Sequence, residues 1–247
     1  MTRSPPALNK AHCLFLDIDG TLVEFTDTPS ETHTDLDVRT LLTDLAAKLD
    51  GALALVSGRE LRTIDALFGP LNLPAAGLHG VERRDAAGEI HGGSASDPKL
   101  NGARAALNQL VLSYPGTLIE DKGPNLAVHF RLAPHFADAV RRAVFAIAAP
   151  LIDSYQLQEG AQVIELKPRG FSKGSAVDAF MKEAPFKGRI PVFIGDDLTD
   201  MDGFAAVEKS GGVSIGVGDR VRAQYHLNGV REVRAYLRAF VTNSWVN

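Results

Sequence analysis

Residues 12–21 read HCLFLDIDGT, and this stretch decides the fold class. The segment His12 to Ile18 is mostly apolar, which is typical of a strand buried on both faces of a parallel sheet. Asp17 and Asp19 come at its carboxyl end, and in extended chain their side chains are expected to project to the same side. Ligands of open α/β sheets bind outside the carboxyl ends of the strands. The stretch therefore predicts an α/β fold with an acidic site at the sheet edge.

The chain around this stretch alternates between short apolar runs and helical spacing. Apolar runs at residues 52–56 and 190–194 have the length of buried strands, whereas the apolar residues of segments 38–49 and 173–181 recur at helical intervals. Strands and helices that alternate in this way form parallel sheets covered by helices. We therefore expect an α/β fold whose core is a Rossmann-like, doubly wound parallel sheet.

The middle of the chain follows a different order, namely helix, two strands, helix, two strands. Consecutive strands without an intervening helix pair in the antiparallel direction, so residues 95–168 are expected to form an inserted, smaller α/β cap domain. Residues 1–94 and 169–247 would then form the core domain. The stretches at residues 91–98 and 167–172, which contain Gly, Ser and Pro, have the composition of linkers between the two domains.

The composition of the 247 residues narrows the class of protein. Hydrophobic residues make up 45% and charged residues 23%, as in ordinary globular domains, and 26 Lys and Arg against 30 Asp and Glu leave a net charge of -4. Without a basic excess we expect neither nucleic acid nor a membrane surface as a partner. The first residues lack the apolar stretch of a secretory signal, and the single cysteine, Cys13, cannot form an intramolecular disulfide. These features predict a soluble cytoplasmic protein.

A second acidic segment, GDDLTD at residues 195–200, also follows a buried apolar strand. Two such strand ends in one sheet would bring several carboxylates into a small volume, where their repulsion needs a cation. Mg²⁺ is the expected cofactor, because it binds a few carboxylates together with waters and a phosphate oxygen. The candidate metal ligands are the carboxylates of the two segments: Asp17, Asp19, Asp196, Asp197 and Asp200.

Two further features add groups that bind phosphate. The turn Ser57-Gly58-Arg59 follows a strand, and Lys173 opens a helix. A hydroxyl, the amides of a glycine turn and an ammonium are the groups that a dianionic phosphate needs around it. Taken alone, Ser57 is more often a helix cap and Lys173 more often a solvated charge. Their order along the chain, between the two acidic segments, favours a site for phosphoryl transfer.

These segments resemble, in the same order, the four motifs of the haloacid dehalogenase superfamily of phosphotransferases, and the resemblance spans almost the entire chain. Within that superfamily the chain is similar to the trehalose-6-phosphate phosphatase family. The stretches that carry this closer similarity are GLHGVERR at 77–84, EDKGPNLAVHFR at 120–131, VIELKPRG followed by SKG at 163–174, and GDDLTDMDGF at 195–204. One departure is Met201, where the family usually has Glu.

The resemblance implies an Mg²⁺-dependent phosphatase that hydrolyses trehalose 6-phosphate through an aspartyl-phosphate. Asp17 would attack phosphorus, and Asp19 would protonate the leaving sugar oxygen and then activate water. Ser57 and Lys173 would hold the transferring phosphoryl group. The metal would be held by Asp17, the backbone carbonyl of Asp19 and Asp196, with the other two acids of the second segment nearby. The pathway partner would be a trehalose-phosphate synthase.

The remaining candidates are substrate-binding residues. They belong to the segments that follow the predicted core strands and to the inserted cap domain. Strand alternation places Ala127, His129 and Arg131 on one face of segment 125–131, opposite an apolar face. Such a polar face suits sugar hydroxyls, which donate and accept hydrogen bonds at once. Together with this polar face, the similarity to the trehalose-6-phosphate phosphatase family implies the following substrate contacts: Gly20, Thr21, Arg59, His79, Lys122, His129, Arg131 and Glu165.

The motifs leave other functions open. The same core could serve a phosphatase of another sugar phosphate, such as sucrose 6-phosphate or mannosyl-3-phosphoglycerate, because only the inserted strands would separate these substrates. A phosphosugar mutase would use the same aspartyl-phosphate but keep water away from it. A signalling receiver domain has no need of an inserted layer or of the acid at Asp19. A catalytically silent regulatory module would not need to retain every reactive group.

Overall fold

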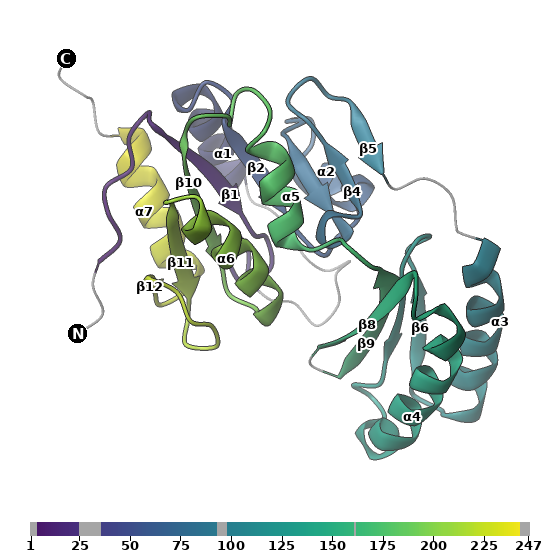
Figure 1. The fold of residues 1–247 in the computed structure, drawn as a ribbon. Coiled ribbons are helices and arrows are strands. Elements are labelled where there is room, and N and C mark those ends of the chain that lie inside the picture. The colour runs from purple at the N-terminus through teal and green to yellow at the C-terminus, as the bar shows by residue number, and fades with distance from the viewer. Residues whose placement is uncertain (1–3, 25–35, 93–97, 161, 243–247) are drawn as a thin grey trace. The chain divides into compact units, whose positions relative to one another are not determined.

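The computed structural model describes residues 4–24, 36–92, 98–160 and 162–242 (Figure 1). The chain divides into two compact units: a core unit, residues 1–92 and 171–247, and an inserted unit, residues 93–170. Each unit has its own hydrophobic core.

The core unit is built on one eight-stranded sheet, which is parallel over six strands and antiparallel at one edge. The strands in spatial order are β12 (Tyr225–Leu227), β11 (Val213–Val217), β10 (Ile190–Gly195), β1 (His12–Leu16), β2 (Leu53–Val56), β3 (Ala75–Gly77), β4 (Glu82–Arg84) and β5 (Ile90–Gly92). The predicted Rossmann-like parallel sheet is confirmed. The sequence analysis missed the edge hairpin of β4 and β5, whose short strands have no buried apolar run.

Five α-helices in the described part of the core unit cover this sheet. Two pairs, α1 with α7 and α5 with α6, pack side by side and cover opposite faces (Figure 1). The helices are α1 (Leu36–Lys48), α2 (Leu61–Phe68), α5 (Lys173–Phe180), α6 (Met201–Lys209) and α7 (Val230–Thr242), with 3-10 turns η2 (Leu78–Gly80) and η5 (Leu198–Asp200). β1 is buried at every position, as a strand covered on both faces must be.

The register of the central strands brings the motifs to one edge of the sheet. β1 lies between β10 and β2, with Leu16 opposite Ile194 on one side and Leu55 on the other. The amide of Asp17 donates to the carbonyl of Ile194 at 3.0 Å. Three polar segments that are far apart in the sequence therefore leave neighbouring strands at the same level.

The inserted unit is an antiparallel sheet covered on one face by two helices. Its apolar positions, such as Val128 and Ile164, pack against the helices, whereas alternate positions such as His129 and Glu165 lie on the other face. The strands in spatial order are β6 (Leu118–Asp121), β7 (Leu126–His129), β9 (Val163–Pro168) and β8 (Tyr155–Gly160). The helices are α3 (Pro98–Ser113), α4 (Ala137–Ala148) and the 3-10 turns η3 (Pro134–Phe136) and η4 (Ala149–Leu151).

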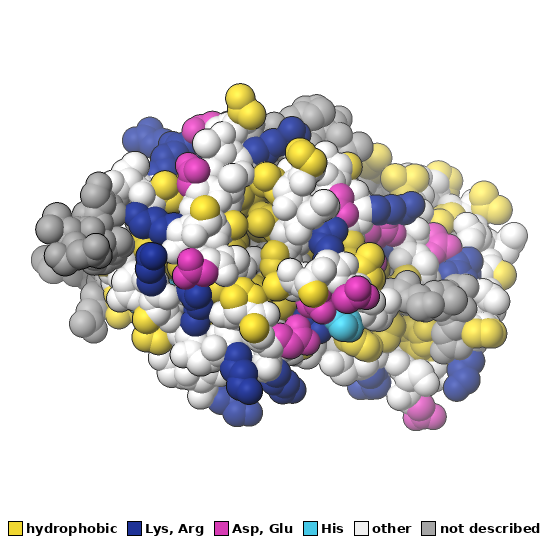
Figure 2. Space-filling view, turned by 90° about the horizontal axis from the view of Figure 1, so that it is seen from above, with side chains coloured by type: hydrophobic (Ala, Val, Ile, Leu, Met, Phe, Trp, Pro, Cys, Tyr) yellow, Lys and Arg dark blue, Asp and Glu magenta, His cyan; other side chains and the backbone are white. Residues whose placement is uncertain are grey.

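The surface carries charges of both signs. On the face in Figure 2, the described acidic and basic side chains are interspersed with hydrophobic ones. None of the helices in the described ranges has both the length and the apolar character that a membrane span requires.

Candidate active site

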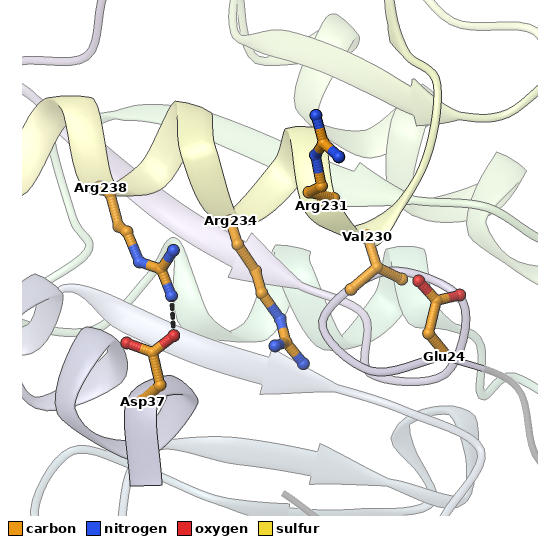
Figure 3. A pocket seen from close by; sticks show the side chains of 6 residues that line it. All are labelled: Glu24, Asp37, Val230, Arg231, Arg234 and Arg238. Atoms are coloured by element: carbon orange, nitrogen blue, oxygen red, sulfur yellow. Dashed lines mark hydrogen bonds and ion pairs between the residues drawn. The ribbon is translucent and has the colours of Figure 1, made fainter. Parts of the chain in front are cut away.

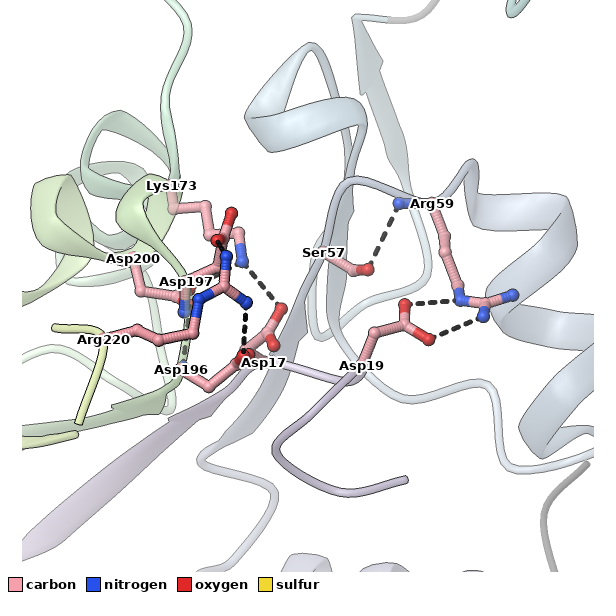
Figure 4. Close-up of polar contacts among 9 residues, drawn as sticks. All are labelled: Asp17, Asp19, Ser57, Arg59, Lys173, Asp196, Asp197, Asp200 and Arg220. Atoms are coloured by element: carbon pink, nitrogen blue, oxygen red, sulfur yellow. Dashed lines mark hydrogen bonds and ion pairs between the residues drawn. The ribbon is translucent and has the colours of Figure 1, made fainter. Parts of the chain in front are cut away.

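Lys173 lies at the centre of the polar site of the core unit (Figure 4). It is the first residue of α5, whose N-terminus is capped by the Ser172 hydroxyl. Its Nζ lies 2.6 Å from Oδ1 of Asp17 and 2.6 Å from Oδ1 of Asp200. The exposed fractions of the lysine, Asp17 and Asp200 side chains are 3%, 6% and 0%. One buried ammonium thus bridges carboxylates that follow β1 and β10.

Burial shifts the proton affinities of these groups. It raises the pKa of Asp17 well above its ordinary value, against the opposing effect of the Lys173 ammonium. Burial also works against the charge of Lys173, but Asp17 and Asp200 outweigh it and raise the pKa of the lysine. Asp196 has its pKa raised to about 7 by burial and by the neighbouring Asp200. The site therefore concentrates more negative charge than Lys173 alone stabilises.

Three carboxylates converge in a geometry that suits a metal ion. Asp17, Asp196 and Asp200 each offer an oxygen, and these oxygens lie within 4.8 Å of one another. Oδ1 of Asp196 is buried and accepts no hydrogen bond within the described part of the chain. A buried carboxylate oxygen without a donor is costly unless a cation approaches it. The donor set consists of hard oxygens, which fits Mg²⁺.

Asp200 also shapes the loop that carries Asp196. Its Oδ2 accepts the backbone N–H of Asp196 at 3.0 Å and that of Asp197 at 2.9 Å, while its Oδ1 accepts Lys173. Gly195 is required beside it, because a Cβ there would lie 2.3 Å from Cγ of Asp200. Asp200 thus fixes the chain direction at the end of β10 as well as contributing charge.

Asp197 pairs with Arg220, whereas Asp17 and Asp200 pair with Lys173. Its Oδ1 lies 3.0 Å from Nη2 of Arg220, whose Nη1 lies 3.9 Å from Oδ2 of Asp196 (Figure 4). Asp197 is not one of the three converging carboxylates. The sequence analysis missed Arg220, although the segment GDR at residues 218–220 follows β11 at the same edge of the sheet.

Asp19 also turns away from Asp17, contrary to the expectation that both side chains project to the same side (Figure 4). Its two oxygens accept a bidentate pair of hydrogen bonds from Arg59, at 2.7 Å from Nε and 2.6 Å from Nη2. The reason is that β1 ends at Leu16 and the chain then turns, with Gly20 in the left-handed region at φ 80°. Strand alternation therefore does not extend to Asp19. Arg59, predicted to contact substrate, pairs with this acid.

The turn Ser57-Gly58-Arg59, which follows β2 and is expected to bind phosphate, is closely packed. Ser57 is buried, and its Oγ accepts the backbone N–H of Arg59 at 3.2 Å. The backbone N–H of His79 donates to the Ser57 carbonyl at 2.9 Å. A Cβ on Gly58 would lie 2.8 Å from the His79 imidazole, so that ring lies directly against the turn. Thr21 is fully buried, and its Oγ1 has no hydrogen-bond partner among the described residues.

A second polar group lies in the inserted unit, on the sheet face without helices. Nε2 of His129 lies 3.0 Å from Oε2 of Glu120, and Nζ of Lys122 lies 3.5 Å from the same oxygen. Lys122 also lies 3.8 Å from Oε1 of Glu165. The hydrogen bond from His129 holds the pKa of Glu120 below its ordinary value, against the effect of burial. The structure thus brings together Lys122, His129 and Glu165, with Glu120 as an addition that sequence reasoning missed.

Two residues of this region differ from expectation. Arg131 was expected to share a face with His129, but β7 ends at His129 and Arg131 is exposed in the following turn. Within the described ranges, no ion pair or side-chain hydrogen bond holds it. Asn125 was not predicted, yet it is fully buried and its Nδ2 donates to Glu165 at 2.9 Å.

A pocket of the core unit, about 190 Å³ in volume, is lined by none of the residues of the acidic site (Figure 3). Across it Arg238 forms an ion pair with Asp37, which ties α7 to α1. Nε of Arg234 donates to the Leu22 carbonyl at 2.9 Å and so fixes the loop that follows Asp19. The remaining lining residues are Glu24, Val230 and Arg231.

Comparison with known proteins places this site in a family. A family model described as trehalose-phosphatase matches residues 15–231. The chain belongs to the trehalose-phosphatase family. It is 42% identical over 238 residues to trehalose-6-phosphate phosphatase of Escherichia coli (strain K12), a match that covers 96% of this chain and 89% of that protein. It is 40% identical over 222 residues to a probable trehalose-phosphate phosphatase of Sinorhizobium fredii, covering 90% and 83%.

Solved structures agree on the fold. A crystal structure described as a trehalose-6-phosphate phosphatase related protein is 29% identical, covers 93% of this chain and 96% of its own, and has a TM-score of 0.77. The C-terminal domain of trehalose-6-phosphate phosphatase of C. albicans has the same fold, with a TM-score of 0.81 at 20% identity and coverage of 96% and 98%. The resemblance drawn from the motifs is confirmed, and the trehalose-phosphatase family makes this chain a phosphoric monoester hydrolase.

Proposed function

We propose that the protein hydrolyses trehalose 6-phosphate to trehalose and phosphate, as a step of trehalose biosynthesis. The observation that carries the proposal is the buried contact of Lys173 with Asp17 and Asp200, beside the Ser57 turn. This contact lies in a chain that is 42% identical over 238 residues to a named trehalose-6-phosphate phosphatase. A buried carboxylate next to a fixed ammonium suits attack on a dianionic phosphate.

In the first step, a carboxylate oxygen of Asp17 attacks phosphorus, and the bond from phosphorus to the sugar oxygen breaks. Oδ1 of Asp17 accepts the hydrogen bond of Lys173, which leaves Oδ2 for the attack. Lys173 opposes the effect of burial on the pKa of Asp17 and so favours its ionised form, and with the Ser57 hydroxyl it holds the phosphoryl oxygens. Asp19 supplies the proton that the departing sugar oxygen needs. The products of this step are an aspartyl-phosphate and free trehalose.

In the second step, Asp19 takes a proton from water, and the water oxygen attacks phosphorus. The bond from Asp17 to phosphorus breaks, which releases phosphate and restores both carboxyl groups. In the resting structure both oxygens of Asp19 accept hydrogen bonds from Arg59. Protonation of Asp19 removes its negative charge and makes one of its oxygens a donor, which weakens the bidentate pair with Arg59. We therefore place an opening of this ion pair in the cycle, before the sugar oxygen is protonated.

We assign the metal site to the converging carboxylates. Asp17 and Asp196 would hold Mg²⁺ together with the backbone carbonyl of Asp19, and Asp200 would orient Asp196 through the backbone N–H groups. The unpartnered Oδ1 of Asp196 is the feature that supports this assignment. When bound, the ion neutralises charge on the carboxylates and on the phosphoryl oxygens.

We assign sugar recognition to the inserted unit. It would act as a cap domain, for which the sequence predicts residues 95–168, on a core domain of residues 1–94 and 169–247. Lys122, His129 and Glu165 offer donors and acceptors on one face, which suits a ligand rich in hydroxyl groups. The single cysteine, Cys13, is free and buried, which favours a reducing cytoplasm as the location. The synthase that forms trehalose 6-phosphate is the expected pathway partner.

The proposal is tested by measuring phosphate release from trehalose 6-phosphate, sucrose 6-phosphate, mannosyl-3-phosphoglycerate, glucose 6-phosphate and 4-nitrophenyl phosphate, with Mg²⁺ or with EDTA. We expect kcat/KM for trehalose 6-phosphate to exceed every other value by about tenfold or more, since tenfold corresponds to only about 1.4 kcal/mol. EDTA should abolish turnover. A preference for the aryl ester over all sugar esters would contradict the substrate, and isomerised sugar without free phosphate would contradict hydrolysis.

A further inference from the structure

Arg220 is the one basic side chain besides Lys173 that reaches the converging acids, among the residues that the structure describes. It lies in the loop between β11 and β12, and its side chain is 51% exposed. Its Nη2 is 3.0 Å from Oδ1 of Asp197, and its Nη1 is 3.9 Å from Oδ2 of Asp196 (Figure 4). The guanidinium thus spans two consecutive acids from their exposed side.

Arg220 changes the balance of charge among the acids that surround it. Four acids meet here: Asp17, Asp196, Asp197 and Asp200. With all four ionised, the two basic side chains Lys173 and Arg220 leave two negative charges, which is the charge that one divalent cation neutralises. Asp19 does not enter this balance, because Arg59 already neutralises it. Without Arg220 the excess would rise to three negative charges.

The two basic side chains act on different oxygens. Lys173 is buried on Oδ1 of Asp17 and Oδ1 of Asp200. Arg220 faces Oδ2 of Asp196, while Oδ1 of the same residue is buried without a hydrogen-bond donor among the described residues. Arg220 therefore leaves the inner oxygen of Asp196 open for a cation. It pairs with Asp197, the acid of this group that is not one of the three converging carboxylates.

We propose that Arg220 is a positioning residue that limits how many carboxylates the metal site offers, by holding Asp197 outside the ligand set. This inference rests on the proposed metal dependence. Mg²⁺ binds through one or two carboxylates and keeps several waters, whereas Ca²⁺ takes six to eight oxygens and gains from each additional carboxylate. A guanidinium beside Asp196 also opposes any dication by simple repulsion. Arg220 thereby keeps the site weak and favours Mg²⁺ over Ca²⁺.

The test is calorimetric titration of the full-length, metal-stripped protein with MgCl₂ and with CaCl₂. For Arg220→Ala we expect about threefold tighter Mg²⁺ binding and about tenfold tighter Ca²⁺ binding, since repulsion is lost for both ions but only Ca²⁺ gains from the freed acid. Arg220→Lys, which keeps the charge, should lie between this variant and the wild type. Arg222→Ala is the matched control, because Arg222 is exposed in the same loop, and it should shift neither affinity by more than about twofold.

A double-mutant cycle identifies the route of the effect. Asp197→Asn alone should change Mg²⁺ affinity by less than about threefold, because Asp197 is held outside the ligand set. Added to Arg220→Ala, it should remove most of the gain in Ca²⁺ affinity. Unchanged or weaker metal binding by Arg220→Ala, with native circular dichroism, would overturn the inference while leaving the proposed metal site intact. A wild-type protein that binds no Mg²⁺ would overturn the proposed metal dependence itself, and this inference with it.

Discussion

Lys173 and its two acids in the core unit keep their charges almost entirely out of water, whereas Lys122 and Glu120 of the inserted unit leave their charges partly in water. In the first, Lys173 and Asp200 have exposed side-chain fractions of 3% and 0% and lie 2.6 Å apart. In the second, Lys122 and Glu120 are 16% and 42% exposed and lie 3.5 Å apart. The two regions contain the same kinds of side chain under different dielectric conditions.

This difference in exposure fits the two proposed roles, phosphoryl transfer in the core unit and substrate recognition in the inserted unit. Buried charges are costly to desolvate, so they persist only in fixed geometry, and a fixed geometry is what a transferring phosphoryl group needs. Partly exposed charges interact more weakly and can rearrange around a ligand. Substitutions in the core site should therefore have large effects on rate and stability. Substitutions in the inserted unit should mainly change substrate affinity.

The largest effect is expected for Asp17→Asn. This change removes the proposed nucleophile while keeping the shape of the side chain, so kcat should fall by about 10⁴-fold or more. Phosphate release from trehalose 6-phosphate is the measurement. Asp178→Asn, which changes an exposed aspartate on α5, is the matched control and should retain activity within about twofold. Turnover above about 1% of wild type in Asp17→Asn would reassign the nucleophile.

The next effect concerns the free energy of unfolding. Lys173→Met leaves Asp17 and Asp200 without their cation, and breaking a buried ion pair in this way costs about 3–5 kcal/mol. Urea denaturation at neutral pH without metal measures the loss. Lys182→Met, an exposed lysine shortly after α5, should change stability by no more than about 0.5 kcal/mol.

A second variant shows whether the loss arises from unpaired charge. Combining Lys173→Met with Asp17→Asn removes one of the stranded carboxylates, so the double variant should recover part of the lost stability. If Lys173→Met unfolds at the same urea concentration as wild type, the buried ammonium is not what stabilises this site.

Metal-free protein should lose stability as the pH rises from about 4 to about 7. Burial raises the pKa of Asp196 to about 7, against 3.8 for an ordinary aspartate, and also raises the pKa of Asp17. In this window the folded state binds protons that the unfolded chain has released, so the free energy of unfolding falls with increasing pH. We expect a loss on the order of 2 kcal/mol relative to the Mg²⁺-bound protein.

Thermal unfolding in EDTA and in MgCl₂ across this pH range measures the difference. The comparison cancels the contribution of surface acids whose pKa is lowered, such as Asp85 and Glu232, because metal does not touch them. Asp196→Asn should flatten the EDTA curve. Parallel curves with and without Mg²⁺ would show that the metal does not act on these carboxylates.

The parts of the core that sequence alone predicts are those set by long apolar runs. β1 and β10 are continuous buried strands, and parallel strands end at the same edge, so the proximity of Asp17 and Asp196 follows from the pattern. Lys173 follows from its place at the start of a predicted helix and from the family motifs. The antiparallel edge could not be predicted, because its short strands carry no hydrophobic signature.

The contacts that sequence could not predict depend on loop conformation. Asp19 pairs with Arg59 because the chain turns immediately after β1, and no periodicity describes a turn. Arg220 reaches Asp197 from a loop after another strand, at a separation in sequence that carries no local signal. Each of these contacts is made by one long side chain, and its direction is set by the folded surroundings.

In the inserted unit, Glu165→Gln should have an intermediate effect. Glu165 lies 3.8 Å from Lys122 and accepts the amide of Asn125, so its loss removes an acceptor from the proposed sugar face. We expect KM for trehalose 6-phosphate to rise about tenfold with kcat changed less, and little change with 4-nitrophenyl phosphate, which has no sugar. Steady-state kinetics on both substrates measure this.

The same sheet provides the control for that prediction. Glu159 lies on β8 and pairs with Arg141 of α4, so it belongs to the helix-covered face. Glu159→Gln should leave KM for both substrates within about twofold, because a partly exposed ion pair contributes little. Equal effects of the two substitutions would mean that the open face of the sheet does not bind sugar.

Arg131→Ala should have the smallest effect, and it tests where the recognition face ends. Strand periodicity places Arg131 beside His129, but β7 ends at His129 and the arginine is exposed in the turn. An exposed side chain without a fixed partner contributes little until a ligand orders it, so KM for trehalose 6-phosphate should change less than about twofold. His129→Ala, the neighbouring substitution within the strand, should raise KM more. If Arg131→Ala raises KM as much as Glu165→Gln does, the turn after β7 rearranges when substrate binds. Arg131 would then lie beside His129 in the bound state, as strand alternation predicts.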